Sequence, residues 1–207
     1  MCEFSNKSTY NAIAKEFSNT RYRVWKKVGE FLDSIPAETL NADIGCGNGK
    51  NMRYRSDIKF LGLDLCENFV KICLDSNLDV IQGNILDLPF ESNYFDNTIS
   101  IAVIHHLKTV EERIKAIDEL IRITKIGGKI LIYVWAFEQP EHARRKFETQ
   151  DVLVPFKLKN SSESFDRFYH VYLYGELEKE IRNVNVELIQ VGYEEGNHYV
   201  IIKKISS

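Results

Sequence analysis

The residues best suited to chemistry lie in a glycine-dense segment, residues 43–50, with the sequence DIGCGNGK. Gly45, Gly47 and Gly49 stand at alternate positions, so one side of the turn carries no Cβ atoms and a ligand can lie against bare backbone. We expect a buried strand before the turn and a helix that begins near Asn48 after it. The free N–H groups of such a helix would attract a carboxylate or a phosphate. The segment therefore predicts a cofactor site.

The spacing of the glycines narrows the choice of ligand. A dinucleotide-binding turn has its third glycine three positions after the second, whereas Gly49 follows Gly47 by only two. A P-loop needs Ser or Thr after its lysine, but Asn51 follows Lys50. The remaining pattern, GxGxG preceded by Asp43, suits a cationic cofactor that carries an amino-acid end.

Two further polar residues follow predicted strands. Asp64 ends the strand predicted over 58–63, about twenty residues beyond the turn, where an acid accepts hydrogen bonds from ribose hydroxyls. It could instead cap the helix predicted over 65–76. Asn84 follows the third strand, where its side-chain carbonyl could accept from a purine amine and the N–H of Ile85 could donate. The alternative for Asn84 is a loop asparagine without a ligand.

The composition is that of an ordinary globular chain. Its 207 residues fit one domain, and 44% are hydrophobic and 28% charged. A net charge of −3 and a pI near 6.0 exclude a globally basic nucleic-acid-binding protein, so RNA contact would come from local patches. We expect reduced intracellular thiols and no metal site, because the cysteines form no CxxC pair and lack histidines at ligand spacing. Without a signal-peptide core or an apolar run of about 18 residues, we expect a cytoplasmic chain with no membrane contact.

The elements that must position these residues alternate along the chain. Two helices are predicted over 8–34, broken at 18–20, with Ser18 or Asn19 as the cap of the second. The remaining strands are predicted over 39–44, 78–82, 95–104 and 129–137, and a further helix over 110–125. Alternation of this kind indicates a mostly parallel sheet with helices on both faces.

The last third of the chain departs from this alternation. Residues 140–148 are predicted to be helical, 150–170 irregular, and 175–182 a short helix. Two β-rich segments, 184–191 and 199–205, are predicted to form a hairpin that closes the sheet. We expect a single domain over 1–207, composed of an N-terminal helical cover (1–37), a cofactor-binding core (38–139), and a substrate-binding segment with the closing hairpin (140–207).

Together with the glycine turn, the segments GLD, LPF, FD and GGKILIYVWAFEQ resemble the class I S-adenosylmethionine-dependent methyltransferases. The chain also resembles one branch of them, the eukaryotic tRNA (carboxymethyluridine) methyltransferases that act at the wobble uridine. That branch is indicated by rarer segments, namely FSNTR (17–21), ISIAVIHHL (99–107), IYVWAFEQ (132–139), DVLVPFKLK (151–159), RFYHVY (167–172) and GNHYVIIKK (196–204). The resemblance spans almost the whole chain.

The resemblance implies a fold and a cofactor. The fold is α/β, a class I methyltransferase (Rossmann-like) domain with a seven-stranded, mostly parallel sheet in the order 3-2-1-4-5-7-6 and a C-terminal antiparallel hairpin. The cofactor is S-adenosyl-L-methionine, with S-adenosyl-L-homocysteine as product. The residues expected to bind it are Tyr10, Asp43, Gly45, Cys46, Gly47, Gly49, Asp64, Leu65, Asn84, Ile85 and Ile101. Leu65 and Asn84 stand where the family usually has an arginine and an acid, which would alter the cofactor contacts modestly.

The resemblance also implies the reaction, methyl esterification of 5-carboxymethyluridine to 5-methoxycarbonylmethyluridine. A carboxylate with a pKa of about 4 is ionised at neutral pH and needs no catalytic base. The residues expected to hold it are Arg21, His105, His106, Arg167, Tyr169, His170 and Asn197. We expect one of His105 and His106 to face the acceptor and the other to pack against the following helix. Arg21 could instead be a solvated charge, and Arg167, Tyr169 and His170 could anchor a loop.

Two partners follow from the resemblance. The first is tRNA, contacted through basic patches at Arg21, Arg23, Lys26 and Lys27, at Arg144, Arg145 and Lys146, and at Lys157 and Lys159, although such charge runs are often only solvated. The second is a small zinc-binding activator that adds a strand at the sheet edge near Asp79 to Gly83, with this chain as the catalytic subunit of the heterodimer.

Two other functions remain open. A small-molecule methyltransferase of the quinone or sterol type would leave DVLVPFKLK and RFYHVY unexplained. A catalytically silent scaffold subunit would leave the intact glycine turn unexplained.

Overall fold

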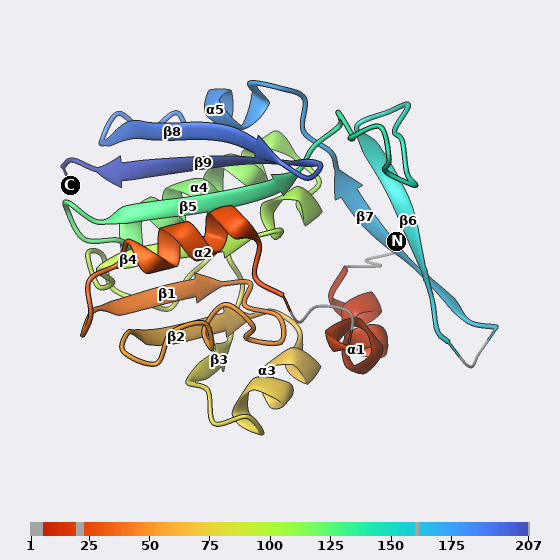
Figure 1. The fold of residues 1–207 in the computed structure, drawn as a ribbon, viewed down its shortest axis with the longest axis horizontal. Coiled ribbons are helices and arrows are strands. Elements are labelled where there is room, and N and C mark those ends of the chain that lie inside the picture. The colour runs from red at the N-terminus through yellow and green to blue at the C-terminus, as the bar shows by residue number, and fades with distance from the viewer. Residues whose placement is uncertain (1–5, 20–22, 160–161, 207) are drawn as a thin grey trace.

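The computed structural model describes residues 6–19, 23–159 and 162–206. Its centre is a seven-stranded sheet in the order β3-β2-β1-β4-β5-β9-β8 (Figure 1). The strands are β1 (Leu40–Ile44), β2 (Lys59–Asp64), β3 (Val80–Gln82), β4 (Asn97–Ile101), β5 (Lys129–Trp135), β8 (Val186–Glu194) and β9 (Asn197–Lys204). The first five pair in parallel, and β9 pairs antiparallel with both β5 and β8. The predicted fold class and strand order are confirmed.

The sequence explains why β4 and β5 occupy the middle of the sheet. Every residue of β4 is buried, and so is the run from Ile130 to Val134 in β5. A strand that is covered on both faces needs such a continuous buried run instead of an alternating one. These strands therefore bring the segment that follows β4 to the carboxyl edge of the sheet, beside the glycine turn.

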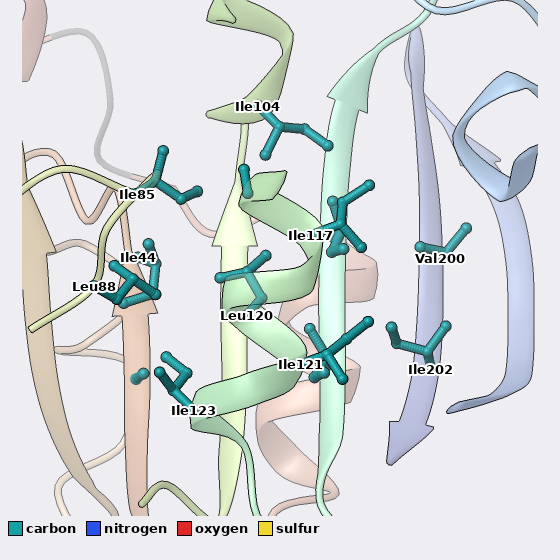
Figure 2. Packing of buried hydrophobic residues seen from close by; sticks show 14 of the residues in the cluster. Ile44, Ile85, Leu88, Ile104, Ile117, Leu120, Ile121, Ile123, Val200 and Ile202 are labelled. Carbon is teal, nitrogen blue, oxygen red and sulfur yellow. The ribbon is translucent and has the colours of Figure 1, made fainter. Parts of the chain in front are cut away.

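Helices cover both faces of the sheet (Figure 1). On one face, α2 (Lys26–Asp33) and α3 (Glu67–Leu74) pack over a cluster that includes Met52, Leu131 and Tyr133. On the other face, α4 (Val110–Ile123) and α5 (Glu176–Glu180) pack over the core shown in Figure 2.

The start of α4 is fixed by a capping box. Thr109 Oγ1 accepts from the N–H of Glu112, whose carboxylate accepts from the N–H of Thr109. The buried face of α4, with Ile117, Leu120 and Ile121, then packs against the sheet (Figure 2).

A second, two-stranded sheet lies beside the main one, and α1 (Asn6–Ser18) lies next to it (Figure 1). It consists of β6 (Asp151–Lys157) and β7 (Ser164–His170). The prediction that 150–170 is irregular is therefore wrong. Leu153 and Pro155 occupy exposed positions of β6, where an alternating strand would carry polar residues, so the alternation is obscured. Pro155 is tolerated because a two-stranded sheet consists only of edge strands.

Three local predictions are also wrong. No helix begins near Asn48, where the chain forms turns closed by Gly49 N–H to Cys46 O and Tyr54 N–H to Asn51 O. No helix forms over 140–148 either, because neither segment carries an apolar stripe at helical spacing. The second helix begins at Lys26, too late for Ser18 or Asn19 to cap it, and the carboxylate of Glu194 accepts the N–H of Lys27 instead.

The C-terminal hairpin is confirmed as β8 and β9, with longer strands and a tighter turn than predicted. Within the described ranges, no helix is long and apolar enough to cross a membrane.

Candidate functional site

The three glycines of the turn after β1 play different roles. A Cβ atom on Gly45 would lie 2.3 Å from a methyl group of Val103, and one on Gly49 would lie 2.3 Å from a methyl group of Leu78. A Cβ atom on Gly47 would meet nothing within 4 Å. Close packing therefore requires Gly45 and Gly49, whereas Gly47 leaves its backbone open to a ligand.

Asp43 lies fully buried one residue before the end of β1. Neither carboxylate oxygen has a hydrogen-bond partner among the described residues. Burial raises the pKa of Asp43 to about 7, although the nearby Asn51 side chain and Lys50 charge oppose this shift. Asn51 lies close enough to affect the pKa without forming a hydrogen bond of acceptable geometry. An unpaired buried acid is costly, so this position fits a cationic group such as the ammonium of an amino acid.

Asp64 joins the glycine turn to α3. Its Oδ2 accepts from the N–H of Gly47 at 2.8 Å, and its Oδ1 accepts from the N–H of Cys66 at 2.8 Å. Burial raises the pKa of Asp64 to about 6, against the lowering effect of these backbone hydrogen bonds. Helix capping and ribose binding are compatible here, because each carboxylate oxygen can accept a second hydrogen bond.

The other residues assigned to the cofactor are placed in different ways. Asn84 is exposed, and its Oδ1 accepts from the N–H of Leu86 at 3.0 Å. Ile85 is buried in the core near Leu88 (Figure 2), so only its backbone could contact a ligand. Leu65 is 39% exposed, whereas the side chains of Cys46 and Ile101 pack in the core on the α2 side.

A short 3₁₀ turn, η1 (Ile104–His106), follows β4 and carries both predicted histidines. His106 Nδ1 lies 2.9 Å from the carbonyl oxygen of Phe168, and its Nε2 lies 3.0 Å from the hydroxyl of Tyr10. A carbonyl only accepts, so Nδ1 carries the hydrogen and Tyr10 donates to Nε2. The Tyr169 hydroxyl, 3.1 Å from that of Tyr10, then donates to Tyr10. This chain of hydrogen bonds connects α1, η1 and β7.

Both histidines are held in the neutral form. Burial lowers the pKa of His106 to about 4; its bond to Phe168 opposes the shift, and the charge of Arg167 reinforces it. Burial also lowers the pKa of His105 well below its usual value. His105 Nδ1 accepts from the N–H of Trp135 at 2.9 Å, so Nε2 carries the hydrogen and can donate.

Arg167 of β7 lies in a cage of aromatic rings and is only 7% exposed. Its guanidinium carbon lies between 5.4 and 6.0 Å from the ring centres of Tyr10, Phe17, Phe156 and Tyr169. Within the described ranges no carboxylate pairs with it, and its Nε has no hydrogen-bond partner. A buried cation without a counter-charge is costly, so the cage fits an anionic ligand.

The structure brings together Tyr10, His105, His106, Arg167 and Tyr169, which we call the acceptor cluster. Tyr10, assigned to the cofactor from the sequence, has its hydroxyl in this cluster. His170 turns to other partners, with Nδ1 at 2.7 Å from Asp151 and Nε2 at 2.9 Å from Glu176.

Asn197, another predicted acceptor residue, lies apart from the acceptor cluster. Asn197 donates to the carbonyls of Glu194 and Glu195 in the β8–β9 turn. Arg21 lies outside the described residues.

Sequence reasoning missed the aromatic walls of the cage, Phe17 and Phe156. Phe17 belongs to the FSNTR segment and lies within the first predicted helix, where an apolar residue by itself indicates only packing. Phe156 lies in the segment predicted to be irregular. Recognising alternation from Val154 to Phe156 would have placed its ring on a strand face.

The chain is similar to several known proteins. The family described as methyltransferase domain matches residues 42–132. A tRNA (carboxymethyluridine(34)-5-O)-methyltransferase of Schizosaccharomyces pombe is 37% identical, with 94% of each chain covered. The tRNA (carboxymethyluridine(34)-5-O)-methyltransferase alkbh8 of Xenopus tropicalis is 36% identical over 95% of this chain but only 40% of its own length.

A solved structure has a similar fold at low sequence identity. It is the complex between the Haloferax volcanii Trm112 methyltransferase activator and a methyltransferase. Its matching chain has a TM-score of 0.72 and 15% identity, with 97% of this chain and 98% of that chain covered.

Proposed function

Because this chain belongs to the tRNA (carboxymethyluridine(34)-5-O)-methyltransferase family, we propose that it esterifies the carboxylate of 5-carboxymethyluridine at the tRNA wobble position, with S-adenosyl-L-methionine as methyl donor. The observation that carries the proposal is the caged guanidinium of Arg167, a buried positive charge with no carboxylate partner among the described residues. A small anionic group of the substrate would supply that counter-charge.

The glycine turn and the two acids would hold the cofactor. Asp43 would face its ammonium group, Asp64 its ribose hydroxyls, and the open backbone at Gly47 the chain between them. When bound, the cofactor supplies an electrophilic methyl group. The carboxyl edge of a parallel sheet is where ligands gather in folds of this type.

The acceptor cluster would orient the carboxylate. Arg167 would bind the oxygen that does not attack, and the Nε2–H of His105 can add a second donor. The acceptor is already ionised at neutral pH, so the neutral histidines have no proton to remove and act by positioning. Correct positioning of the reacting groups can contribute about 7–11 kcal/mol.

The aromatic rings around Arg167 have a second effect. They exclude water from the guanidinium and so strengthen its attraction for a carboxylate.

Val103 and the histidines link the glycine turn to the acceptor cluster. Val103, which packs against Gly45, precedes His105 by only two residues.

The proposal is tested by methyl transfer in vitro. The chain, together with its activator protein, is incubated with methyl-labelled cofactor and tRNA that carries 5-carboxymethyluridine, and the product is treated with mild alkali. We expect label that alkali releases, because an ester is hydrolysed whereas N-methyl and C-methyl groups are stable. The matched control is the same tRNA without the carboxymethyl group. Alkali-stable label, or equal labelling of the control tRNA, would refute the proposed reaction.

We also propose that an activator protein pairs with the edge strand β3. Among the described strands β3 pairs only with β2, and beside it lies a hollow of about 370 Å³. Its lining includes Leu74 and Tyr94, which are 53% and 44% exposed. Exposed apolar side chains along an open edge favour strand addition by a partner. A chain that is monodisperse and fully active when expressed alone would rule out an obligate partner.

A further inference from the structure

A groove of about 780 Å³ opens beside the glycine turn. It is lined by residues 18 and 19 at the end of α1, by residues 23 and 24, and by residues 48, 50, 53 and 54. Among its described lining residues are three cationic side chains, Arg23, Lys50 and Arg53, and no acidic one. In a chain whose net charge is −3, this concentration of positive charge marks the groove as a site for an anion.

Two of the cations are held in place at the groove. Lys50 Nζ lies 5.0 Å from the centre of the Trp25 ring, and Arg53 Nη2 donates to the carbonyl of Asn48 at 2.7 Å. The groove therefore offers positive charge in fixed positions, which suits phosphate oxygens.

The groove lies next to the acceptor cluster. The ring of Phe17 forms part of the cage around Arg167, and the next residue, Ser18, lines the groove. Asn48 Nδ2 donates to the carbonyl of Ser18 at 3.3 Å, which ties the end of α1 to the glycine turn. A nucleotide bound at Arg167 would thus have its neighbours close to Lys50 and Arg53.

We propose that this groove binds the phosphodiester backbone of the tRNA beside the nucleotide that is methylated. The inference rests on the proposed function, which brings RNA to the acceptor cluster. Lysine and arginine contacts to phosphates set the position and much of the affinity of a nucleic acid without reading its sequence. The groove therefore holds the substrate strand, whereas Arg167 recognises its carboxylate.

The test compares Arg23→Gln and Arg53→Gln with a matched control, Lys115→Gln. Lys115 is an exposed lysine on α4, across the sheet from α2. Binding of an unmodified tRNA transcript is measured by fluorescence anisotropy at several salt concentrations, and affinity for S-adenosylmethionine by calorimetry. We expect each groove variant to bind tRNA about three- to tenfold more weakly, with the salt slope reduced by about one unit. We expect the control and the cofactor affinity to stay within twofold of wild type.

The outcomes separate this inference from the proposed function. Unchanged tRNA binding by both groove variants would overturn the inference, and so would the absence of tRNA binding by the wild-type protein. Weaker binding of the cofactor would also overturn it, because the groove would then hold the carboxylate of the cofactor. None of these binding results depends on methyl transfer, so a failed esterification assay would count against the proposed reaction alone.

Discussion

The hydroxyl of Tyr10 lies 3.0 Å from Nε2 of His106, so the first helix of the chain is hydrogen-bonded to the turn after β4. The same hydroxyl lies 3.1 Å from that of Tyr169 on β7. Three segments far apart in the sequence thus meet at one oxygen atom. Because Tyr10 both donates and accepts there, its hydroxyl fixes the position of the acceptor cluster.

Replacing Tyr10 with phenylalanine removes this hydroxyl but keeps the ring against Phe69. His106 Nε2 then loses its donor, and leaving a buried acceptor unsatisfied costs about 1–3 kcal/mol. We expect kcat/KM for tRNA to fall about tenfold or more, with the Kd of S-adenosylmethionine within twofold of wild type. Steady-state kinetics and calorimetry measure the two quantities. A large rise in the cofactor Kd alone would instead place Tyr10 in the cofactor site.

Replacing Arg167 with methionine separates activity from stability. The buried guanidinium has no counter-charge among the described residues, so an apolar side chain of similar length should keep or raise the free energy of unfolding. Methyl transfer to the carboxymethylated tRNA should fall by at least about a hundredfold, because the carboxylate loses its cation. Urea unfolding and the alkali-release assay measure these effects.

The matched control for the loss of charge is Lys115→Met, which removes an exposed lysine. It should leave both stability and methyl transfer near wild type. An Arg167→Met protein that unfolds readily would show that the guanidinium stabilises the fold. Full activity in that variant would exclude Arg167 from carboxylate binding.

The parts of the fold predicted correctly are those with a strong local pattern. The buried runs of β4 and β5 and the amphipathic stripe of α4 each determine their own element, and their alternation determines the sheet. The hairpin of β6 and β7 carries no such signal, because the apolar Leu153 and Pro155 occupy exposed positions of β6 and hide the period of two. Its strands are stabilised by contacts with α1, which is distant in sequence.

In the candidate site, too, the features set by local sequence could be predicted and those set by packing between distant segments could not. The glycine spacing and Asp43 were sufficient to predict a cofactor with an amino-acid end, because turn geometry is a local property. The shared hydroxyl of Tyr10 and the cage around Arg167 depend on the packing of α1 against β7. No spacing within either segment reveals that contact.

The low pKa of His106 predicts an effect of pH on stability. The pKa is about 4 in the folded protein and 6.5 ordinarily, so between these values the unfolded chain binds more protons at this residue. This contribution is fully present above pH 6.5 and is lost as the pH falls toward 4, by up to about 3 kcal/mol. Asp43 and Asp64, whose pKa values are raised, change stability in the opposite direction.

The contribution of His106 is therefore measured as the difference in free energy of unfolding between the wild type and a variant without the histidine. Urea unfolding of wild type and His106→Gln is compared between pH 4.5 and pH 7.5, a range of about three pH units around the affected window. We expect the stability advantage of the wild type over the variant to shrink as the pH is lowered. A constant difference would mean that His106 is not held neutral by burial.

The raised pKa of Asp43 predicts the pH dependence of cofactor binding. With a pKa of about 7, the buried carboxyl group is mostly protonated at pH 6 and mostly ionised at pH 8. A cationic ligand binds the ionised form better, so the affinity for S-adenosylmethionine should rise about tenfold over this range. Above pH 8 the affinity should stay nearly constant. Asp43→Asn should bind more weakly and without this dependence. Calorimetry in buffers of different ionisation enthalpy would also detect the proton released on binding.

The roles of Gly45 and Gly47 in the glycine turn can be separated by alanine substitution. At Gly45, where φ is +79°, a methyl group would collide with Val103, so left-handed strain and overpacking both act, each costing about 1–3 kcal/mol. At Gly47, where φ is +55°, the methyl group meets no protein atom, and the cost is limited to about 1–2 kcal/mol of backbone strain. We therefore expect Gly47→Ala to remain folded while its methyl group occupies the space meant for the cofactor, raising the Kd of S-adenosylmethionine about tenfold or more. Gly45→Ala should have a lower free energy of unfolding than Gly47→Ala. Thermal unfolding with and without the cofactor distinguishes them, and normal cofactor binding by folded Gly47→Ala would move the binding site away from this turn.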